Sequence, residues 1–291
     1  MFSGQSKLLK TMMKKCLSKR LYFTGTSGNI SYPETILEFD RKRERVTGNN
    51  FIVSLSPVIV AIPGLTLNND CSDFRLEFSR TENKFSVKSE VINKISLIDL
   101  NLNYFRLLST TSEPLNMLKD LKILLQNIYD RFYNNQNKLK VTYSELRKIL
   151  ICYVEPRPVY LVSYTKNGQN YGFPIDLGGN INDNYFIVSL SKNNSFLSDI
   201  TAMKSVAVSV MSSKFSVDSI FKSETPVNIF GNLKSQLLNF PVPLYSIKVM
   251  ELEKLERTHL GSHIQFYFKV ISVFQEKSDE NYLTHTSIYN C

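Results

Sequence analysis

Glu155-Pro156-Arg157-Pro158-Val159-Tyr160-Leu161-Val162-Ser163-Tyr164 is the stretch of this 291-residue chain that decides its fold. Its two prolines precede a run of apolar and aromatic residues, and Asn167-Gly168 follows shortly after. This dipeptide is typical of a two-residue hairpin turn, because both central residues of such a turn favour positive φ. We therefore expect Arg157 and the prolines to set the path of the chain into one strand, which turns back into a second.

The second strand leads into a loop rich in glycine and in acidic or amide residues, expected from Pro174 to Asn184. Glycine lets a backbone bend sharply or approach a planar ligand closely, and Pro174 fixes the end of the strand. The segment is therefore either a long surface loop or a place where a ligand meets bare backbone.

Further strands follow as far as Phe274, with few long helices between them. Such a pattern is typical of an antiparallel barrel or sandwich rather than of a doubly wound sheet. We expect these strands at Tyr185–Leu190, Val206–Met211, Leu244–Leu252 and Ile264–Phe274.

An N-terminal lobe of short strands precedes this region, and helices separate the two. Apolar residues recur at helical spacing from Ser112 to Phe132, and shorter helices are expected from Ser144 to Ile151 and around Leu197 to Ala202. The lobe strands are expected at Ile36–Asp40, Phe51–Ile62, Phe74–Phe78 and Lys84–Val87. The predicted organisation is a basic, disordered tail (1–30), an N-terminal β lobe (31–110), a helical connection (111–152) and a second β domain (153–291), which folds alone or as one unit with residues 31–152.

One hexapeptide occurs twice: Phe51-Ile52-Val53-Ser54-Leu55-Ser56 recurs as Phe186-Ile187-Val188-Ser189-Leu190-Ser191. A duplicated half-barrel would explain the recurrence. The flanking residues diverge at once, so the alternative is two strands built from the same common residues.

The net charge of +9 is concentrated near the N-terminus, where six lysines and arginines precede the first acidic residue, Glu34. The rest of the chain is nearly balanced, which argues against a nucleic-acid partner. The tail is either a disordered end or an amphipathic helix that contacts a membrane surface or directs import into an organelle.

The four cysteines are scattered, without a Cys-x-x-Cys pair, and no signal peptide with a small-residue cleavage site is recognisable. These features favour a reducing, cytoplasmic setting. No apolar run reaches the roughly 18 residues that span a bilayer, so we expect a soluble protein without a transmembrane segment.

Two of the three histidines, His259 and His263, stand four residues apart. On a helix this spacing could hold a metal ion, with Glu253 or Glu256 as a third ligand. Gly261 and the β-like run that follows favour a turn into a strand instead, where the two imidazoles point differently. His263 then either serves a ligand site or is structural.

A second candidate is Ser191-Lys192-Asn193-Asn194-Ser195, between a strand and the expected helix around Leu197. A cation, side-chain amides, hydroxyls and free backbone N–H groups could together hold a phosphate. The same composition is also that of an ordinary loop.

In their order along the chain, these pieces resemble the flavin reductase-like family over roughly residues 144–275. The sequence contains no Gly-x-Gly-x-x-Gly after a strand, no phosphate-binding Gly-Lys-Ser/Thr loop, no Gly-x-Ser-x-Gly and no His-Glu-x-x-His. The resemblance is carried by Pro156-Arg157-Pro158-Val159, the Asn-Gly hairpin, Phe173–Leu177, Tyr185–Leu190, Met203–Val210 and Gly261-Ser262-His263-x-x-Phe266.

The resemblance implies a mainly β (α+β) fold, an antiparallel split β-barrel that binds FMN in a groove at the interface of a homodimer, with NADH or NADPH as co-substrate. The N-terminal lobe and helices are additions to that minimal domain. The positions carried over are Phe173, Pro174, Ile175 and Asp176 for the flavin ring, Lys192, Asn194 and Ser195 for the phosphate, and His263 for the catalytic face, with no metal.

The chain departs from many members of the family, which carry Ser-x-x-Pro-Pro after the ring-facing loop, because Gly178-Gly179-Asn180-Ile181 stands there. The implied function is hydride transfer from NAD(P)H to flavin. The alternative is a non-catalytic flavin-binding or interaction protein that keeps the barrel as a dimer scaffold. A third reading is a basic, tethered scaffold whose N-terminal tail meets an acidic membrane surface or nucleic acid.

Overall fold

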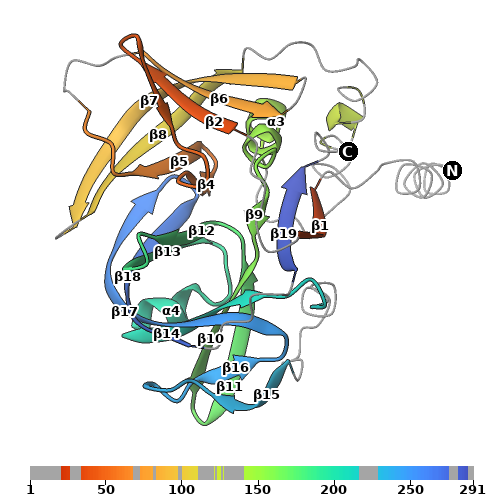
Figure 1. The fold of residues 1–291 in the computed structure, drawn as a ribbon, viewed down its shortest axis with the longest axis vertical. Coiled ribbons are helices and arrows are strands. Elements are labelled where there is room, and N and C mark those ends of the chain that lie inside the picture. Colours follow the sequence, from red (N-terminus) through yellow and green to blue (C-terminus); the bar gives the residue numbers. More distant parts are fainter. Residues whose placement is uncertain are drawn as a thin grey trace, which may run out of the picture.

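The computed structural model describes residues 21–26, 34–67, 73–80, 83–97, 100–110, 121, 123–125, 127, 141–215, 229–274 and 281–287. They form two lobes of antiparallel sheet, drawn one above the other in Figure 1. The expected mainly β fold is therefore confirmed.

The C-terminal lobe contains one seven-stranded sheet in the order β11-β10-β14-β17-β18-β13-β12. The expected hairpin joins β10 to β11, and Asn167 and Gly168 in its turn have φ values of 52° and 75°. The expected long loop is shorter than predicted, because β12 forms within it. The strands are β10 (Tyr160–Lys166), β11 (Gln169–Ile175), β12 (Gly178–Ile181), β13 (Tyr185–Ser191), β14 (Ser205–Met211), β17 (Ser246–Leu260) and β18 (His263–Phe274).

This sheet is rolled into a barrel. Strands β11 and β12 are its opposite edges, yet only Asp176 and Leu177 separate them along the chain. Three strands lie between β10 and β13 in the sheet, but the rings of Tyr160 and Phe186 on these strands are 5.0 Å apart. The edge strands do not pair with each other among the described residues, so the barrel is split, as expected.

One apolar core fills the barrel, because alternate side chains of each strand point inward. The hairpin β15 (Phe230–Lys234) and β16 (Pro241–Pro243) is inserted between β14 and β17, and α4 (Leu197–Ala202) follows β13, where a helix was expected. The core residues include Val162, Phe173, Ile175, Phe186, Val188, Val208, Leu252, Phe266 and Phe268.

The N-terminal lobe contains a second seven-stranded sheet, in the order β3-β2-β6-β7-β8-β5-β4. Here the single strand expected from Phe51 to Ile62 is two strands, which turn at Ser56 and Pro57. The strands are β2 (Glu34–Phe39), β3 (Lys42–Arg45), β4 (Phe51–Leu55), β5 (Val58–Pro63), β6 (Phe74–Arg80), β7 (Asn83–Leu97) and β8 (Leu100–Thr110).

Helix α3 (Tyr143–Cys152) joins the lobes and confirms the shorter predicted helix. Thr142 and Glu145 form a capping box at its start, in which each side chain bonds the other's backbone N–H. Of the helix expected from Ser112 to Phe132, residues 121, 123–125 and 127 are helical, and the rest lies outside the described residues. No described helix is long and apolar enough to cross a membrane.

A small third sheet lies beside the lobes in the order β1-β19-β9. Its first strand falls within the segment expected to be a disordered tail, so that expectation is wrong for these residues. Residues 1–20 and 27–33 lie outside the described residues. The strands are β1 (Leu21–Thr26), β9 (Arg157–Pro158) and β19 (Tyr282–Ser287).

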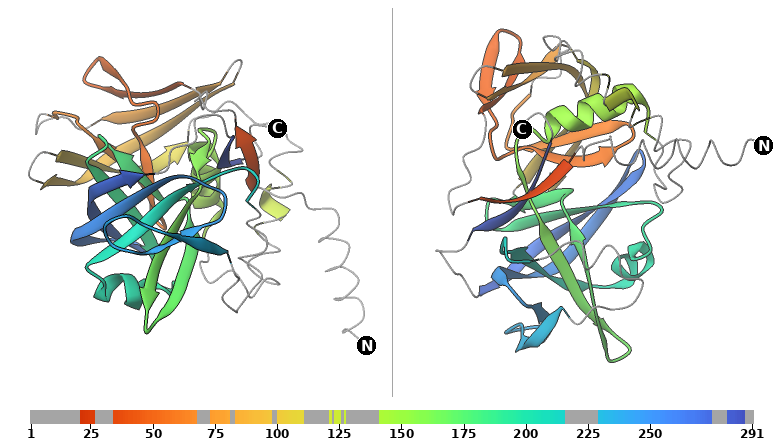
Figure 2. Two further views of the ribbon diagram at one scale, coloured as in Figure 1. Left: turned by 60° about the horizontal axis from the view of Figure 1, so that its bottom comes forward. Right: turned by 90° about the vertical axis from the view of Figure 1, so that its right-hand side faces the viewer.

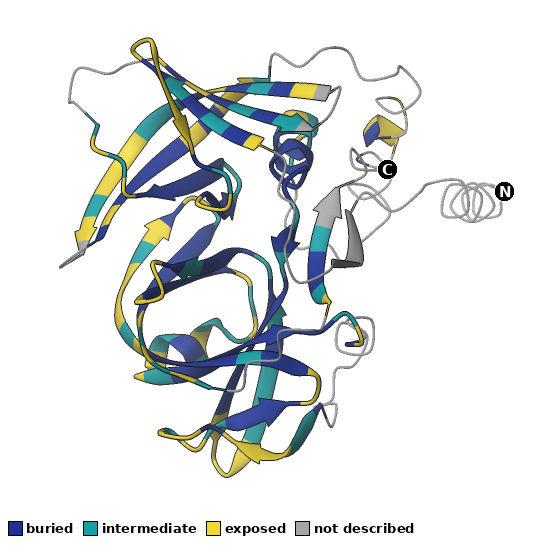
Figure 3. Cartoon of the chain, in the orientation of Figure 1, coloured by how far each residue is buried: buried dark blue, intermediate teal, exposed yellow. Residues whose placement is uncertain are grey.

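The two lobes pack face to face through strands β4, β5 and β8 of one and β12, β13 and β18 of the other. Figure 2 shows this arrangement from two further sides, and Figure 3 shows that β4 and β5 are almost wholly buried. A continuous apolar cluster lies in the interface and includes Phe51, Val53, Ala61, Leu102 and Tyr104 of the N-terminal lobe and Tyr185, Ile187, Leu260 and Tyr267 of the barrel.

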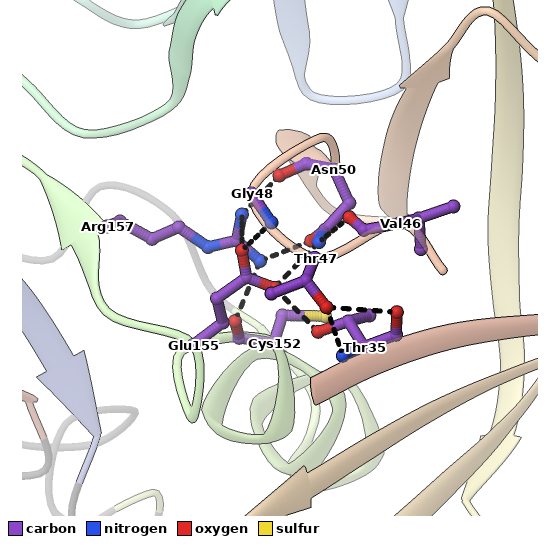
Figure 4. A network of polar contacts seen from close by, with 8 residues as sticks. All are labelled: Thr35, Val46, Thr47, Gly48, Asn50, Cys152, Glu155 and Arg157. Atoms are coloured by element: carbon purple, nitrogen blue, oxygen red, sulfur yellow. Dashed lines mark hydrogen bonds and ion pairs between the residues drawn. The ribbon is translucent and has the colours of Figure 1, made fainter. Parts of the chain in front are cut away.

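A buried ionic network holds the segment that leads from α3 into the barrel against the N-terminal lobe (Figure 4). Glu155, at the start of the opening stretch, accepts hydrogen bonds from Thr35 Oγ1 (2.7 Å), Asn50 Nδ2 (2.7 Å) and Gly48 N (2.8 Å). Arg157 donates through Nη2 to Asn50 Oδ1 (2.6 Å) and to the Cys152 carbonyl (3.0 Å). Arg157 therefore does more than set the path of β10, because it fixes the loop that leads into β4 of the other lobe.

Candidate functional site

His263, the first residue of β18, lies where three distant segments of the chain meet. It pairs across the sheet with Ser191, the last residue of β13. The next residue, Lys192, donates its backbone N–H to the Ser262 carbonyl (3.0 Å). The β11–β12 connection is near as well, because Ser189, two residues before Ser191 on β13, donates its backbone N–H to the Leu177 carbonyl (2.9 Å). The expected ring, phosphate and catalytic segments thus come together at one end of the barrel.

The N-terminal lobe supplies a wall of this site that the sequence did not reveal. The β17–β18 turn docks on the β4–β5 turn: Ser262 N donates to Ser56 O (2.8 Å), and Ser56 N donates to Ser262 Oγ (3.0 Å). The Ser56 hydroxyl in turn donates to Glu145 of α3 (2.7 Å). These bonds hold the turn before His263 against both β4 and α3.

The imidazole of His263 is held in one tautomer. Its Nδ1 lies 2.8 Å from Ser262 Oγ and accepts a longer bond, 3.5 Å, from the Leu55 backbone N–H. A backbone N–H can only donate, so Nδ1 is the acceptor and the proton sits on Nε2. Burial lowers the pKa of His263 to about 4; the Asp176 carboxylate opposes this shift and Lys192 adds to it. His263 is therefore a neutral hydrogen-bond donor near pH 7.

Gln265 and Tyr267 lie on the same face of β18 as His263, toward the N-terminal lobe. The Tyr267 hydroxyl bonds the Tyr104 hydroxyl (2.5 Å). Gln265 is fully buried, and neither polar atom of its amide forms a hydrogen bond of standard geometry. Burial raises the pKa of the Tyr104 hydroxyl, and the nearby Gln265 amide opposes that shift. An unpaired buried amide costs about 1–3 kcal/mol, which a water molecule or a ligand group would recover.

Asp176 is held by its own chain. Its carboxylate accepts from the Tyr153 hydroxyl (2.7 Å) and pairs with His285 of β19. Burial alone would raise the pKa of Asp176, but His285 and then Tyr153 outweigh it and lower the pKa below its usual value. The carboxylate therefore stays charged and joins α3, the barrel edge and β19, which restricts its freedom to contact a ligand.

The remaining ring-facing residues alternate along the end of β11. Phe173 and Ile175 point into the barrel core, where Phe173 stacks on Phe196 with ring centroids 4.6 Å apart. Pro174 is half-buried and lies on the opposite face. A ligand at this strand would therefore meet backbone and Pro174 rather than the side chains of Phe173 and Ile175.

Most backbone N–H groups of the expected phosphate loop are not free to bind a ligand. The N–H groups of residues 192, 193, 194, 196 and 197 all donate to oxygens of this protein. Asn194 uses its Oδ1 in one of these bonds. The groups that can still bond a ligand include the ammonium of Lys192, the Asn194 amide nitrogen and the hydroxyl of Ser195.

The two histidines of the possible metal site lie on opposite faces of the β17–β18 hairpin. His259 pairs with Ile264, which points into the barrel, whereas His263 pairs with Leu260 in the lobe interface. The arrangement as a turn entering a strand, which Gly261 indicated, is confirmed.

The close packing of the β17–β18 turn on the β4–β5 turn can be tested at Gly261. Its φ is +53°, and a Cβ there would lie 2.5 Å from Pro57 Cδ and 2.7 Å from Ser56 O. Gly168 is a matched control, because its φ is +75° but nothing lies within 4 Å. We expect Gly168→Ala to lower the free energy of unfolding by about 1 kcal/mol through backbone strain, and Gly261→Ala by about 3 kcal/mol through the added overlap. Urea unfolding measures both, and equal losses would show that the turns can separate without cost.

No protein-family model matches the chain, and no curated protein matches it significantly. The chain is similar to solved structures of flavin reductases and FMN-binding proteins. The flavin reductase PheA2 is 17% identical, over 49% of this chain and 96% of its own, with a TM-score of 0.42. The NADH:FAD oxidoreductase SgcE6 of Streptomyces globisporus C-1027 is 16% identical, over 48% and 86%, with a TM-score of 0.42. An FMN-binding protein from Thermus thermophilus is 18% identical, over 42% and 71%, with a TM-score of 0.37. TM-scores below 0.5 assign neither a ligand nor an activity to this chain.

Proposed function

We propose that the protein binds FMN at this end of the barrel and transfers hydride to it from NADH or NADPH. The observation that supports this most is the meeting of the β11–β12 connection, the Lys192 loop and the His263 turn. The family resemblance assigns the flavin ring, the phosphate and the catalytic face to these same segments, which lie far apart in the sequence.

The side chains at this end suit an anionic, planar cofactor. The exposed ammonium of Lys192, with the Asn194 amide nitrogen and the Ser195 hydroxyl, would hold a phosphate in place of backbone donors. Pro174 and the backbone of β11 would face the ring. The unpaired amide of Gln265, two residues along β18 from His263, offers a further donor and acceptor for a polar edge.

A bound flavin would supply the hydride-accepting chemistry, so the site needs no dedicated acid–base pair. The protein's own residues bind and orient. His263 presents Nε2–H as a fixed donor, because Ser262 and Leu55 occupy Nδ1. Its lowered pKa keeps it neutral, so it would polarise or position a ligand carbonyl without adding a charge.

The direct test is whether the purified protein takes up FMN and then oxidises NADH or NADPH. We expect flavin absorbance after incubation with FMN and rapid bleaching of that absorbance by one of the two nucleotides without oxygen. FAD in place of FMN shows which flavin is preferred. A protein that takes up neither flavin would remove this function.

His263→Ala should lower the rate of flavin reduction roughly tenfold, the effect of losing about 1.4 kcal/mol of positioning. FMN affinity should change little, because the proposed phosphate contacts lie on the loop of Lys192. His259→Ala is the matched control, since His259 lies on the opposite face of the hairpin. Stopped-flow reduction under anaerobic conditions measures the rate, and equal rates in wild type and His263→Ala would contradict the role of His263.

The second candidate is a flavin-binding or interaction protein without turnover. One observation favours it: His263 is only 2% exposed, so the lobes must separate or shift for a nicotinamide to reach it. FMN uptake without oxidation of either nucleotide would establish this function. In both cases the family resemblance implies a homodimer with the site at the subunit interface.

A further inference from the structure

The two sheets have the same topology. When the strands of each lobe are lettered a to g in chain order, both sheets read b-a-e-f-g-d-c. The a–b hairpins also match, because each turns through two residues with positive φ: Asp40 and Arg41 in β2–β3, and Asn167 and Gly168 in β10–β11.

The longest hairpins agree residue by residue. Strands β7 and β17 each have 15 residues. When Asn83, the first residue of β7, is aligned with Ser246, the first residue of β17, the residue pairs between β7 and β8 coincide with those between β17 and β18. Two irregularities interrupt each ladder at the same places, after Lys88 and Val91 in one lobe and after Glu251 and Lys254 in the other. Strand order alone can arise twice independently, but a shared pattern of bulges is a much stricter agreement.

Counterpart residues meet each other at the interface between the lobes. The same alignment makes Tyr104 the counterpart of Tyr267, and their hydroxyls are hydrogen-bonded. Ala61 and Ile187 are also counterparts. Because Phe51 pairs with Ala61 and Gly179 pairs with Ile187, Phe51 is the counterpart of Gly179. The Phe51 ring lies directly over Gly179, where a Cβ would be 2.5 Å from Cε1. Contacts between equivalent residues are the mark of a two-fold, isologous interface.

We infer that the N-terminal lobe is a diverged second copy of the barrel and takes the place of a partner subunit, so that one chain is a complete pseudo-dimer. The repeated hexapeptide is not the trace of this duplication, because it falls on strand c in one lobe (β4) and on strand d in the other (β13). The face that a second subunit would cover is buried within the chain.

The residues at equivalent places on the two sides of the lobe interface now differ. His263 and Gln265 correspond to Leu100 and Leu102, which are buried in the apolar interface cluster. Of these two described pairs of counterparts, only the side chains on β18 can bond a polar ligand. If the proposed function holds, each chain binds one FMN rather than two, and the β4–β5 turn provides the wall that the partner provides in a homodimer.

The mass of the full chain in solution tests the self-contained pseudo-dimer independently of any flavin. We expect light scattering after size exclusion to give 33.5 kDa over a wide range of concentration. The inserted β15–β16 region exposes Leu233 and Leu237, 61% and 65% accessible, which could associate separately. The double variant Leu233→Lys, Leu237→Lys controls for this: a dimer that it dissolves leaves the inference intact, whereas a dimer that persists in it overturns the inference.

Titration with FMN, followed by flavin fluorescence, tests the single site. One FMN per chain supports the loss of the second site, and two per chain overturn it. An absence of FMN binding would remove the proposed function and with it the single flavin site, while the mass measurement would still decide whether the chain is its own partner.

Discussion

Glu155→Ala should lower the free energy of unfolding by about 4 kcal/mol. The variant leaves the guanidinium of Arg157 buried without its nearest carboxylate, whose Oε1 lies 4.0 Å from Nη1. It also removes the acceptor for three donors, the Thr35 hydroxyl, the Asn50 amide and the Gly48 N–H. Urea unfolding followed by circular dichroism measures the loss.

Two control variants distinguish the loss of a buried carboxylate from the loss of side-chain volume or of an exposed charge. Glu155→Gln keeps the volume and one acceptor oxygen, so it should lose about 2 kcal/mol and remain folded if the alanine variant does not. Glu77→Gln removes a carboxylate from a surface pair with Arg43, and exposed pairs contribute at most about 1 kcal/mol. If Glu155→Ala costs no more than Glu77→Gln, the network does not stabilise the contact between the connecting segment and the N-terminal lobe. Because Asn50 directly precedes β4, the same variant should also loosen the Leu55–Ser56 turn beside His263.

The parts of the fold that the sequence predicted are those set by local chemistry. Asn167-Gly168 predicts its turn because both residues accept positive φ. The helix expected from Ser144 to Ile151 forms as α3, whose start Thr142 and Glu145 cap. The β4–β5 turn has no such signal. Ser56-Pro57 lies within a run of valine and isoleucine that looks like one long strand, so the contribution of Leu55 and Ser56 to the site could not be foreseen.

The sequence did not reveal the second barrel, because bulges interrupt its strands and because both faces of β8 are buried. Between Val91 and Asn93 a bulge moves the odd-numbered residues of β7 from one face to the other, so that Val91 packs in the N-terminal core and Ile95 in the lobe interface. A simple alternation of polar and apolar residues cannot follow that change. Strand β8 is apolar on both faces, since Phe105 packs in the core and Tyr104 in the interface, and it therefore lacks the expected pattern.

The phosphate loop shows a different limit. Composition correctly marked the segment from Ser191 to Ser195 as polar and near the site, and Lys192 does lie beside His263. Composition could not show that the turn consumes its own backbone donors, because those bonds depend on the local fold and on the distant Ser262 carbonyl. A loop that is predicted to bind phosphate can therefore use only those donors that remain free after folding.

The stability of the protein should fall as the pH is lowered from 6.5 to about 4, and His263 should account for about 3 kcal/mol of that fall. Burial lowers its pKa from 6.5 in the unfolded chain to about 4 in the folded protein. Between these values the unfolded state binds a proton that the folded state does not, which favours unfolding by about 1.4 kcal/mol per pH unit. Above pH 6.5 both states are neutral at this residue, so its contribution to stability is fully present there.

His263→Gln isolates this contribution, because glutamine keeps a polar amide but cannot titrate. Urea unfolding of both proteins at several pH values should give curves that run parallel above pH 6.5 and diverge below it, with the wild type losing about 3 kcal/mol more by pH 4. Asp176 does not produce this difference, since its pKa is lowered below the usual range by His285 and Tyr153 and it is present in both proteins. Parallel curves throughout would mean that burial does not lower the pKa of the imidazole, which would contradict the lowered pKa assigned to His263.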